Sequence, residues 1–91
     1  MAVHAYVLIR CEGGKMKQVV EQLRKKEHVE RAYTVFGDYD VIARIKVSEM
    51  PSSFSVLRLE EVVVDEIQKI KGVISTSTHI VTSMDPEPEK D

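Results

Sequence analysis

The sequence predicts an α+β domain with a ferredoxin-like βαββαβ order of elements and a four-stranded antiparallel sheet. Three observations lead to this fold class. The chain has 91 residues, which is room for a single hydrophobic core. Apolar residues alternate along four segments and recur at helical spacing along two others. The order of these segments, combined with right-handed crossovers, places both helices on the same face of the sheet.

The first two elements are a strand over residues 2–11 and a helix over residues 15–26. Along the strand every second residue is apolar, so one of its faces is suited to a core. Residues 12–14, which include two glycines, interrupt this alternation. The helix then presents an apolar stripe that consists of Met16, Val19, Val20 and Leu23.

Two strands over residues 29–36 and 39–47 follow and form a hairpin. Both segments are rich in β-branched or aromatic residues, which favour strands. Gly37 and Asp38 join them, and these residue types tolerate the positive φ of a tight turn. We therefore expect a tight hairpin at this point of the chain.

The C-terminal part contains a loop over residues 48–55, a helix over 56–70 and a strand over 73–82, with Gly72 suited to end the helix. The core stripe of this helix is expected to be Val56, Leu59, Val63, Ile67 and Ile70. Three apolar residues outside the stripe indicate a second covered surface, such as a subunit contact: Leu57, Val62 and Val64. Residues 1–82 then form one domain, and residues 83–91 form an acidic, disordered tail.

The sheet face opposite the helices is expected to be less polar than a face open to water. It combines apolar and basic side chains: Tyr6, Leu8, Ile42, His4, Arg10, Arg44 and Lys46. A chain of this size buries only about 60–65% of its unfolded surface, so self-association would stabilise it. We favour the packing of two subunits through this face over a partly solvated face.

Composition argues against several functional classes. The net charge is −2 and the basic residues form no stripe, so direct binding of nucleic acid is not expected. No segment has the roughly 20 apolar residues of a membrane span, and no signal peptide is visible. We therefore expect a cytoplasmic protein without a membrane contact. Plentiful Glu, Lys, Val and Ile, with no Asn or Trp, weakly favour a heat-adapted source.

Neither a metal site nor a catalytic site is expected. Cys11 is the single cysteine, and His28 stands alone in a turn. His4 and His79 could lie near each other on paired strands, but the sequence places no carboxylate beside them. No pairing of His with Asp, Cys or Ser has a compelling spacing, so we expect no cofactor and no enzyme. Small dimeric barrel enzymes with the same order of elements remain an alternative.

Two segments carry a resemblance to a known family. Residues 35–41 read Val-Phe-Gly-Asp-Tyr-Asp-Val, and residues 70–73 read Ile-Lys-Gly-Val ahead of the strand with Thr76, Thr78, Ile80 and Val81. Both resemble the ligand-sensing (RAM) domain of the Lrp/AsnC transcription regulators, and the likeness extends over residues 2–82. Lys71 stands where the family commonly has proline, and the segment over residues 49–55 looks longer than usual.

The resemblance implies a dimeric α/β barrel, the assembly of dimers into larger rings and small amino acids bound between dimers. Family members normally carry a helix-turn-helix ahead of this domain, whereas the first strand begins here at residue 2. We therefore expect a stand-alone sensing domain that modulates transcription, with full-length Lrp/AsnC regulators as possible partners. The residues that the resemblance assigns to the effector pocket are Gly37, Asp38, Tyr39, Asp40, Thr76 and Thr78.

The chemistry of these residues suits an amino acid. Backbone N–H groups at a glycine turn can hold a carboxylate, and either Asp38 or Asp40 can accept from an ammonium group. Threonine hydroxyls can do either. Two alternatives stay open: that Gly37 only makes the turn while Tyr39 only packs, and that the domain assembles with full-length regulators without any ligand.

Overall fold

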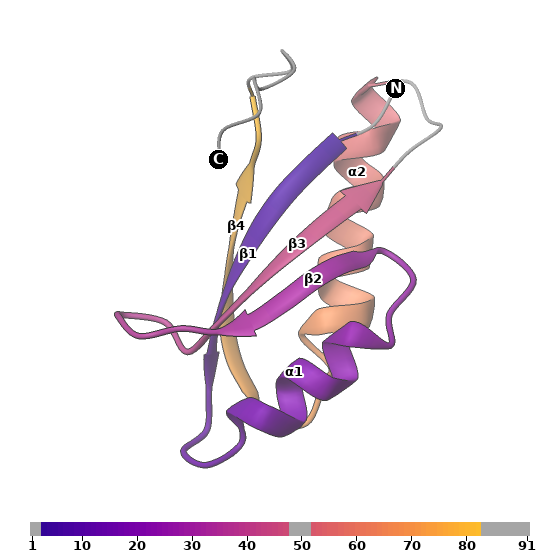
Figure 1. Cartoon of the computed structure of the whole chain (residues 1–91). Coiled ribbons are helices and arrows are strands. Elements are labelled where there is room, and N and C mark those ends of the chain that lie inside the picture. The colour runs from indigo at the N-terminus through magenta and orange to yellow at the C-terminus, as the bar shows by residue number, and fades with distance from the viewer. Residues whose placement is uncertain (1–2, 48–51, 83–91) are drawn as a thin grey trace.

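The structure is a computed structural model that describes residues 3–47 and 52–82. Its elements are β1 (Val3–Cys11), α1 (Met16–Arg24), β2 (Val29–Thr34), β3 (Val41–Val47), α2 (Ser52–Val62), the π-helical turn η1 (Val63–Ile67) and β4 (Val73–Ile80). The strands form one antiparallel sheet in the order β2-β3-β1-β4, and both helices cover the same face of it (Figure 1). The predicted ferredoxin-like fold is confirmed. The predicted tail over residues 83–91 lies outside the described residues.

The core lies between the two central strands and the helices. Along β1 the residues Ala5, Val7 and Ile9 are fully buried, and along β3 every second residue from Val41 to Val47 is buried as well. These are the apolar strand faces that the alternation predicts. Leu23 of α1 meets this layer from the helix side, as do Leu59 and Ile67 from the second helical segment. Each large side chain buried in this way contributes about 1.5–3 kcal/mol relative to exposure.

Helix α1 covers the β2 side of the sheet, whereas α2 lies over β1 and β3. Neither helix makes extensive contact with β4 within the described residues. The end of α1 lies two residues before the predicted end because the chain tightens there, and the N–H of Lys25 donates to the carbonyl of Gln22 at 3.2 Å. The helix layer is therefore offset toward one edge of the sheet.

Helix α2 begins at Ser52, four residues before the predicted start, so the expected loop over residues 48–55 is shorter. The sequence offers the Pro-Ser-Ser run both as loop breakers and as candidate helix caps, and the helix begins within this run because these residue types are preferred at helix starts. Val62 is buried, contrary to the prediction, because it follows Leu59 by three residues and so shares its face. Leu57 and Val64 are exposed, as expected. The side chain of Val56 lies outside the described residues.

The helix widens at its C-terminal end into η1, where the N–H of Gln68 donates to the carbonyl of Val63 at 2.9 Å. This π-helical turn begins within a run of three valines, whose branched side chains fit a regular helix less well. Gly72 then turns the chain toward β4 with a φ of +100°, a conformation that favours glycine. A Cβ at this position would come within 3.0 Å of the Lys15 Cβ, so glycine also permits the close approach of α1.

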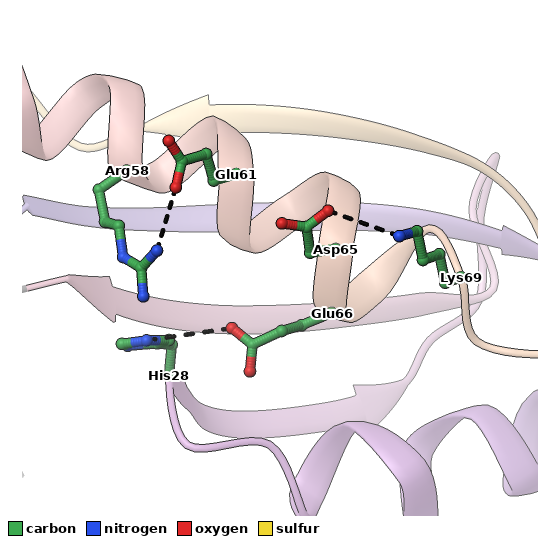
Figure 2. A network of polar contacts seen from close by, with 6 residues as sticks. All are labelled: His28, Arg58, Glu61, Asp65, Glu66 and Lys69. Atoms are coloured by element: carbon green, nitrogen blue, oxygen red, sulfur yellow. Dashed lines mark hydrogen bonds and ion pairs between the residues drawn. The ribbon is translucent and has the colours of Figure 1, made fainter.

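Ion pairs line the outer surface of the second helical segment (Figure 2). Arg58 lies 3.0 Å from Glu61, and Lys69 lies 3.6 Å from Asp65. Pairs exposed to this extent stabilise by about 0–1 kcal/mol. His28, expected to stand alone, instead has its Nε2 atom 4.0 Å from the carboxylate of Glu66, so it links the turn before β2 to η1.

Candidate functional site

The hairpin loop is longer than the tight turn that the sequence predicts. Strand β2 ends at Thr34 and β3 begins at Val41, and the N–H of Val35 donates to the carbonyl of Asp40 at 2.9 Å. Gly37 has a φ of +145° in the loop that this pair closes. The backbone of Asp40 holds the loop next to β1, because its N–H donates to the carbonyl of Ile9 at 2.9 Å. The strands therefore separate before reaching the Gly-Asp pair.

The carboxylate of Asp40 has a structural partner as well. Its Oδ2 atom accepts a hydrogen bond from the backbone N–H of Cys11 at 2.8 Å. The backbone N–H of Cys11 points to the β3 side of β1, as the carbonyl of Ile9 does, and the pairing of β1 with β3 ends at Ile9 opposite Val41. Asp40 therefore supplies a partner to a backbone group that lies beyond the end of the ladder. Burial, and secondarily the negative charge of Asp40, raise the pKa of the Cys11 thiol, so this cysteine stays protonated and unreactive at neutral pH.

A groove with a volume of about 560 Å³ lies beside the hairpin loop. One wall is the hairpin, and the other is the connection between β1 and α1. The residues that line it are Gly14, Met16, Lys17, Thr34, Val35, Phe36, Gly37 and Asp40. Phe36 is fully exposed at the rim, so the groove has a large apolar side chain that is free to cover a bound molecule.

The two ends of this groove differ in charge. Helix α1 begins at Met16 with neither a side-chain cap nor an acidic residue in its first turn, so its first N–H groups are available to an anion. Lys17 adds a positive charge at the same end. Across the groove Asp40 brings a carboxylate with its Oδ1 atom still able to accept. This arrangement can bind a small zwitterion.

A second hollow of about 490 Å³ lies where the second helical segment passes beside β4. Its lining residues are Leu59, Glu60, Val63, Val64, Gln68, Thr76, Thr78 and Ile80. The amide Nε2 of Gln68 donates to the hydroxyl of Thr76 at 2.9 Å. This hollow is lined by one carboxylate and no cation, so its charge does not match a zwitterion as the first groove does.

The predicted site residues are thus divided between two places. Gly37 and Asp40 line the hairpin groove, while Asp38 and Tyr39 belong to the same loop without lining it. Thr76 and Thr78 line the second hollow, at the other edge of the sheet. Sequence reasoning did not assign the other six lining residues to the site, among them Gly14, Met16 and Lys17 of the opposite wall. It treated the glycines as a strand breaker and Met16 as part of the helix core stripe.

Comparisons with known proteins identify the family. The family profile described as the Lrp/AsnC ligand binding domain matches residues 4–85. The chain belongs to the Lrp/AsnC family. The matched region includes the hairpin loop, both hollows and all four strands, so this Lrp/AsnC domain accounts for the whole described structure.

Curated relatives are transcriptional regulators. The HTH-type transcriptional regulator FL11 from Pyrococcus abyssi is 35% identical over 79 residues, which cover 85% of this chain and 46% of the regulator. An uncharacterised HTH-type transcriptional regulator from Pyrococcus horikoshii is 32% identical over 80 residues, 88% of this chain and 47% of that protein. The Lrp/AsnC domain therefore spans about half the length of the curated relatives it matches.

Solved structures confirm the fold. TTHA0845 from Thermus thermophilus is 28% identical with a TM-score of 0.79, and the match covers 93% of this chain and 99% of that one. E. coli AsnC is 21% identical with a TM-score of 0.81, over 98% of this chain and 56% of its own. Chains with the extent of this Lrp/AsnC domain, as well as longer ones, therefore share its architecture.

The sheet face opposite the helices is mixed in character, as predicted for this Lrp/AsnC domain. Tyr6 is 39% exposed on this face. The guanidinium of Arg10 stacks over the Tyr39 ring, 5.2 Å from its centroid. His4, expected to lack a carboxylate, lies 3.8 Å from Glu30, which also pairs with Arg44 at 3.4 Å. Within residues 3–47 and 52–82, no group of three potential ligands could hold a metal ion.

Two further properties concern the described residues alone. No helix among them has the length and apolarity that crossing a bilayer requires. His79 contacts Ser77 at 3.0 Å on β4, whereas His4 contacts Glu30 of β2, so the two histidines have different partners.

Proposed function

We propose that this domain binds a small amino acid in the hairpin groove and transmits its occupancy to transcription through subunit assembly. The observation that carries the proposal is the charge arrangement of the groove. The start of α1 with Lys17 forms one end, and Asp40 forms the other. An α-amino acid has its carboxylate and ammonium group one carbon apart, so both ends can be satisfied by one small molecule.

The groove also suits the side chain of such a ligand. Met16 and Phe36 supply apolar surface, and the exposed Phe36 can close over the ligand. Gly37 leaves the hairpin wall free of a side chain, so the ligand backbone can approach the loop. Asp38 and Tyr39 then fix the loop conformation or contact a neighbouring subunit.

Three similar proteins support the proposal of a ligand-binding regulator. A transcriptional regulator from Neisseria meningitidis was solved as a complex with L-methionine; it is 14% identical to this chain with a TM-score of 0.74. The curated relatives are named as HTH-type regulators, not as enzymes. In our proposal the domain senses the ligand without contacting nucleic acid itself and needs no DNA-binding segment for ligand binding.

Assembly is the second part of the proposal. The open sheet face carries Tyr6, Tyr33 and Ile42 around a hollow, and packing against a second copy would remove this apolar surface from water. The result would be the dimeric α/β barrel that the resemblance implies. Ligand binding next to such contacts couples sensing to assembly as one equilibrium.

The test is a thermal-shift screen of the 91-residue chain against the common amino acids. A ligand that binds only the folded state stabilises it, and a concentration about one hundred times Kd adds about 2.7 kcal/mol. We expect at least one amino acid to raise the midpoint by several degrees. Lys17→Gln should abolish this shift, whereas Lys25→Gln, at the far end of the same helix, should preserve it. No shift with any amino acid at millimolar concentration would contradict the proposal.

One observation favours a second candidate function. The Asp40 carboxylate already bonds the Cys11 N–H, so the hairpin can be explained as a purely structural element. In that case the domain is an assembly partner of full-length regulators and needs no ligand. This alternative predicts stable co-purification with a helix-turn-helix member of the family and no thermal shift with any amino acid.

A further inference from the structure

We propose that Arg10 is a positioning residue for the hairpin groove: it stacks on Tyr39 at the open sheet face and thereby holds Asp40 where its carboxylate can bind a ligand. This inference rests on the proposed function, because it concerns the affinity of the same groove. Three observations support it: the attachment of the hairpin loop to β1, the origin of the opposite groove wall and the unusual contact of Arg10.

Two neighbouring residues of the hairpin loop are attached to three consecutive residues of β1. The N–H of Asp40 donates to the carbonyl of Ile9 at 2.9 Å, and the N–H of Cys11 donates to the Asp40 Oδ2 atom at 2.8 Å. Between these bonds, the guanidinium of Arg10 lies over the Tyr39 ring, 5.2 Å from its centroid. Since successive side chains of a strand point to opposite faces, Arg10 is on the open face while its neighbours are buried. Two bonds to the β1 backbone and one stacking contact therefore hold the loop.

The opposite wall of the groove continues from the same strand. It leaves β1 at Cys11 and reaches Lys17 in the first turn of α1. The N–H of Glu12, between them, donates to the carbonyl of Gly72 at 2.8 Å, so this wall has its own anchor. The width of the groove therefore depends on how the hairpin loop is held at the end of β1. Asp40 is both a lining residue of the groove and part of that attachment.

The contact of Arg10 sets it apart among the arginines of residues 3–47 and 52–82. Each of the others donates to, or pairs with, an oxygen atom: Arg24, Arg31, Arg44 and Arg58. Arg10 instead faces an aromatic ring, whose quadrupole attracts a cation and whose flat surface suits a planar guanidinium. The stacking limits the movement of the Tyr39 ring. Because Asp40 is the next residue, the same contact limits the movement of its backbone.

A fixed position of Asp40 matters because of the ligand proposed for the groove. Its Oδ2 atom is taken by the N–H of Cys11, so Oδ1 is the atom left for an ammonium group. The carboxylate and ammonium group of an α-amino acid are one carbon apart, so one molecule reaches both Lys17 and Asp40 only while their separation is constant. Binding groups must be held to within about 0.5 Å by the residues behind them. Arg10 and Tyr39 are such residues and need not touch the ligand.

The first measurement requires no amino acid. Arg10→Gln removes the stacked cation and keeps a long polar side chain. Lys46→Gln is the matched control, because it removes a cation from the same sheet face at the opposite end of the pairing between β1 and β3. We expect the N–H groups of Cys11 and Asp40 to exchange with solvent about two- to fivefold faster in Arg10→Gln than in Lys46→Gln, followed by NMR, because opening of the loop no longer breaks a cation–π contact. Equal exchange in the two variants would overturn the proposal.

The second measurement concerns affinity, for the member of the common amino-acid panel that gives the unaltered chain its largest thermal shift. By calorimetry we expect Kd to rise about two- to fivefold in Arg10→Gln and to stay unchanged in Lys46→Gln. Tyr39→Leu should weaken binding by the same factor, whereas Tyr39→Phe keeps the ring and should preserve Kd. The double variant of Arg10→Gln with Tyr39→Leu should bind as weakly as either single variant, because both act through one contact. Additive losses would contradict this role of Arg10.

These results separate failure of this inference from failure of the proposed function. If the unaltered chain binds an amino acid and Arg10→Gln binds it with the same Kd, the role of Arg10 is wrong and the proposed function stands. If no member of the panel shifts the unaltered chain, the proposed function fails, and the role of Arg10 in that groove fails with it. Circular dichroism verifies that each variant is folded.

Discussion

The two edges of the sheet are built differently. The β2 edge is covered by α1, carries charged residues and has an outward carbonyl bonded by Arg24. The β4 edge extends beyond the helix layer, has no carboxylate, lysine or arginine, and exposes Ile74 and Ile80. The β2 side therefore carries more of the interactions that stabilise the single chain, and the β4 side carries more exposed apolar surface.

The largest expected effect compares a leucine buried near the β2 edge with an exposed leucine of the other helix. Leu23 of α1 is fully buried on the β2 side, whereas Leu57 of α2 is 57% exposed. Leu23→Ala should lower the free energy of unfolding by about 2–5 kcal/mol through lost burial and the cavity left behind. Leu57→Ala should stay within about 0.5 kcal/mol in dilute, monomeric chain. Urea denaturation measures both, and equal losses would contradict the assigned difference.

A smaller effect is expected where the hairpin loop meets β1. Asp40→Ala leaves the buried N–H of Cys11 without an acceptor, which costs about 1–3 kcal/mol. Asp40→Asn retains an acceptor oxygen and should lose less than half of that amount. If both variants were equally destabilised, the charge of Asp40 and not its hydrogen bond would be the main contribution. Thermal denaturation at neutral pH separates these outcomes.

The β2 edge can be exposed by removing the guanidinium of Arg24. Arg24→Ala frees the carbonyl of Ala32 and should cost about 1 kcal/mol, the net contribution of a typical hydrogen bond, because this carbonyl lies near the surface and can bind water instead. Lys25→Ala, one residue later and without such a bond, is the control. We also expect Arg24→Ala to aggregate faster on heating, followed by light scattering, because the β2 edge then resembles the β4 edge. Equal behaviour of both variants would refute the protective role of Arg24.

The smallest effect concerns pH. The pKa of Cys11 is raised by burial and by Asp40, so the folded state holds the thiol proton more tightly than the unfolded state does. The contribution of this thiol to the free energy of unfolding is fully present below the unfolded-state pKa of about 9 and is lost as pH rises through the folded-state pKa. Cys11→Ala should therefore flatten the decline of stability above about pH 9. An unchanged decline would show that other groups cause it.

Much of this fold follows from periodicity alone. The alternation along β1 and β3 and the helical spacing around Leu23 and Leu59 reflect burial against one core, and burial is what sequence patterns record best. The start of α2 could not be predicted from the sequence, because proline and serine are typical both of loops and of helix starts. Val62 was misjudged because a stripe drawn through every fourth residue leaves out its i+3 neighbours.

The candidate site was harder to predict from the sequence than the fold was. Gly37 and Asp40 were predicted from the hairpin motif and do line a groove, but the opposite wall, which includes Lys17, comes from a distant loop. The bond from Cys11 to Asp40 joins residues 29 positions apart, and no local pattern encodes it. The family resemblance assigned Thr76 and Thr78 to the same pocket as the hairpin residues. Within the single chain, however, both threonines lie on β4, at the other edge of the sheet.

The most direct measurement of the difference between the two edges is amide hydrogen exchange, followed residue by residue by NMR at several protein concentrations. The N–H of Ser77 bonds β1 and should be protected throughout, whereas those of Thr76 and Thr78 face the free edge. At the lowest concentration we predict slow exchange at Ser77 and fast exchange at Thr76 and Thr78, because only the N–H of Ser77 has a ladder partner in the single chain. Equal protection of Ser77, Thr76 and Thr78 at that concentration would contradict the difference between the two edges.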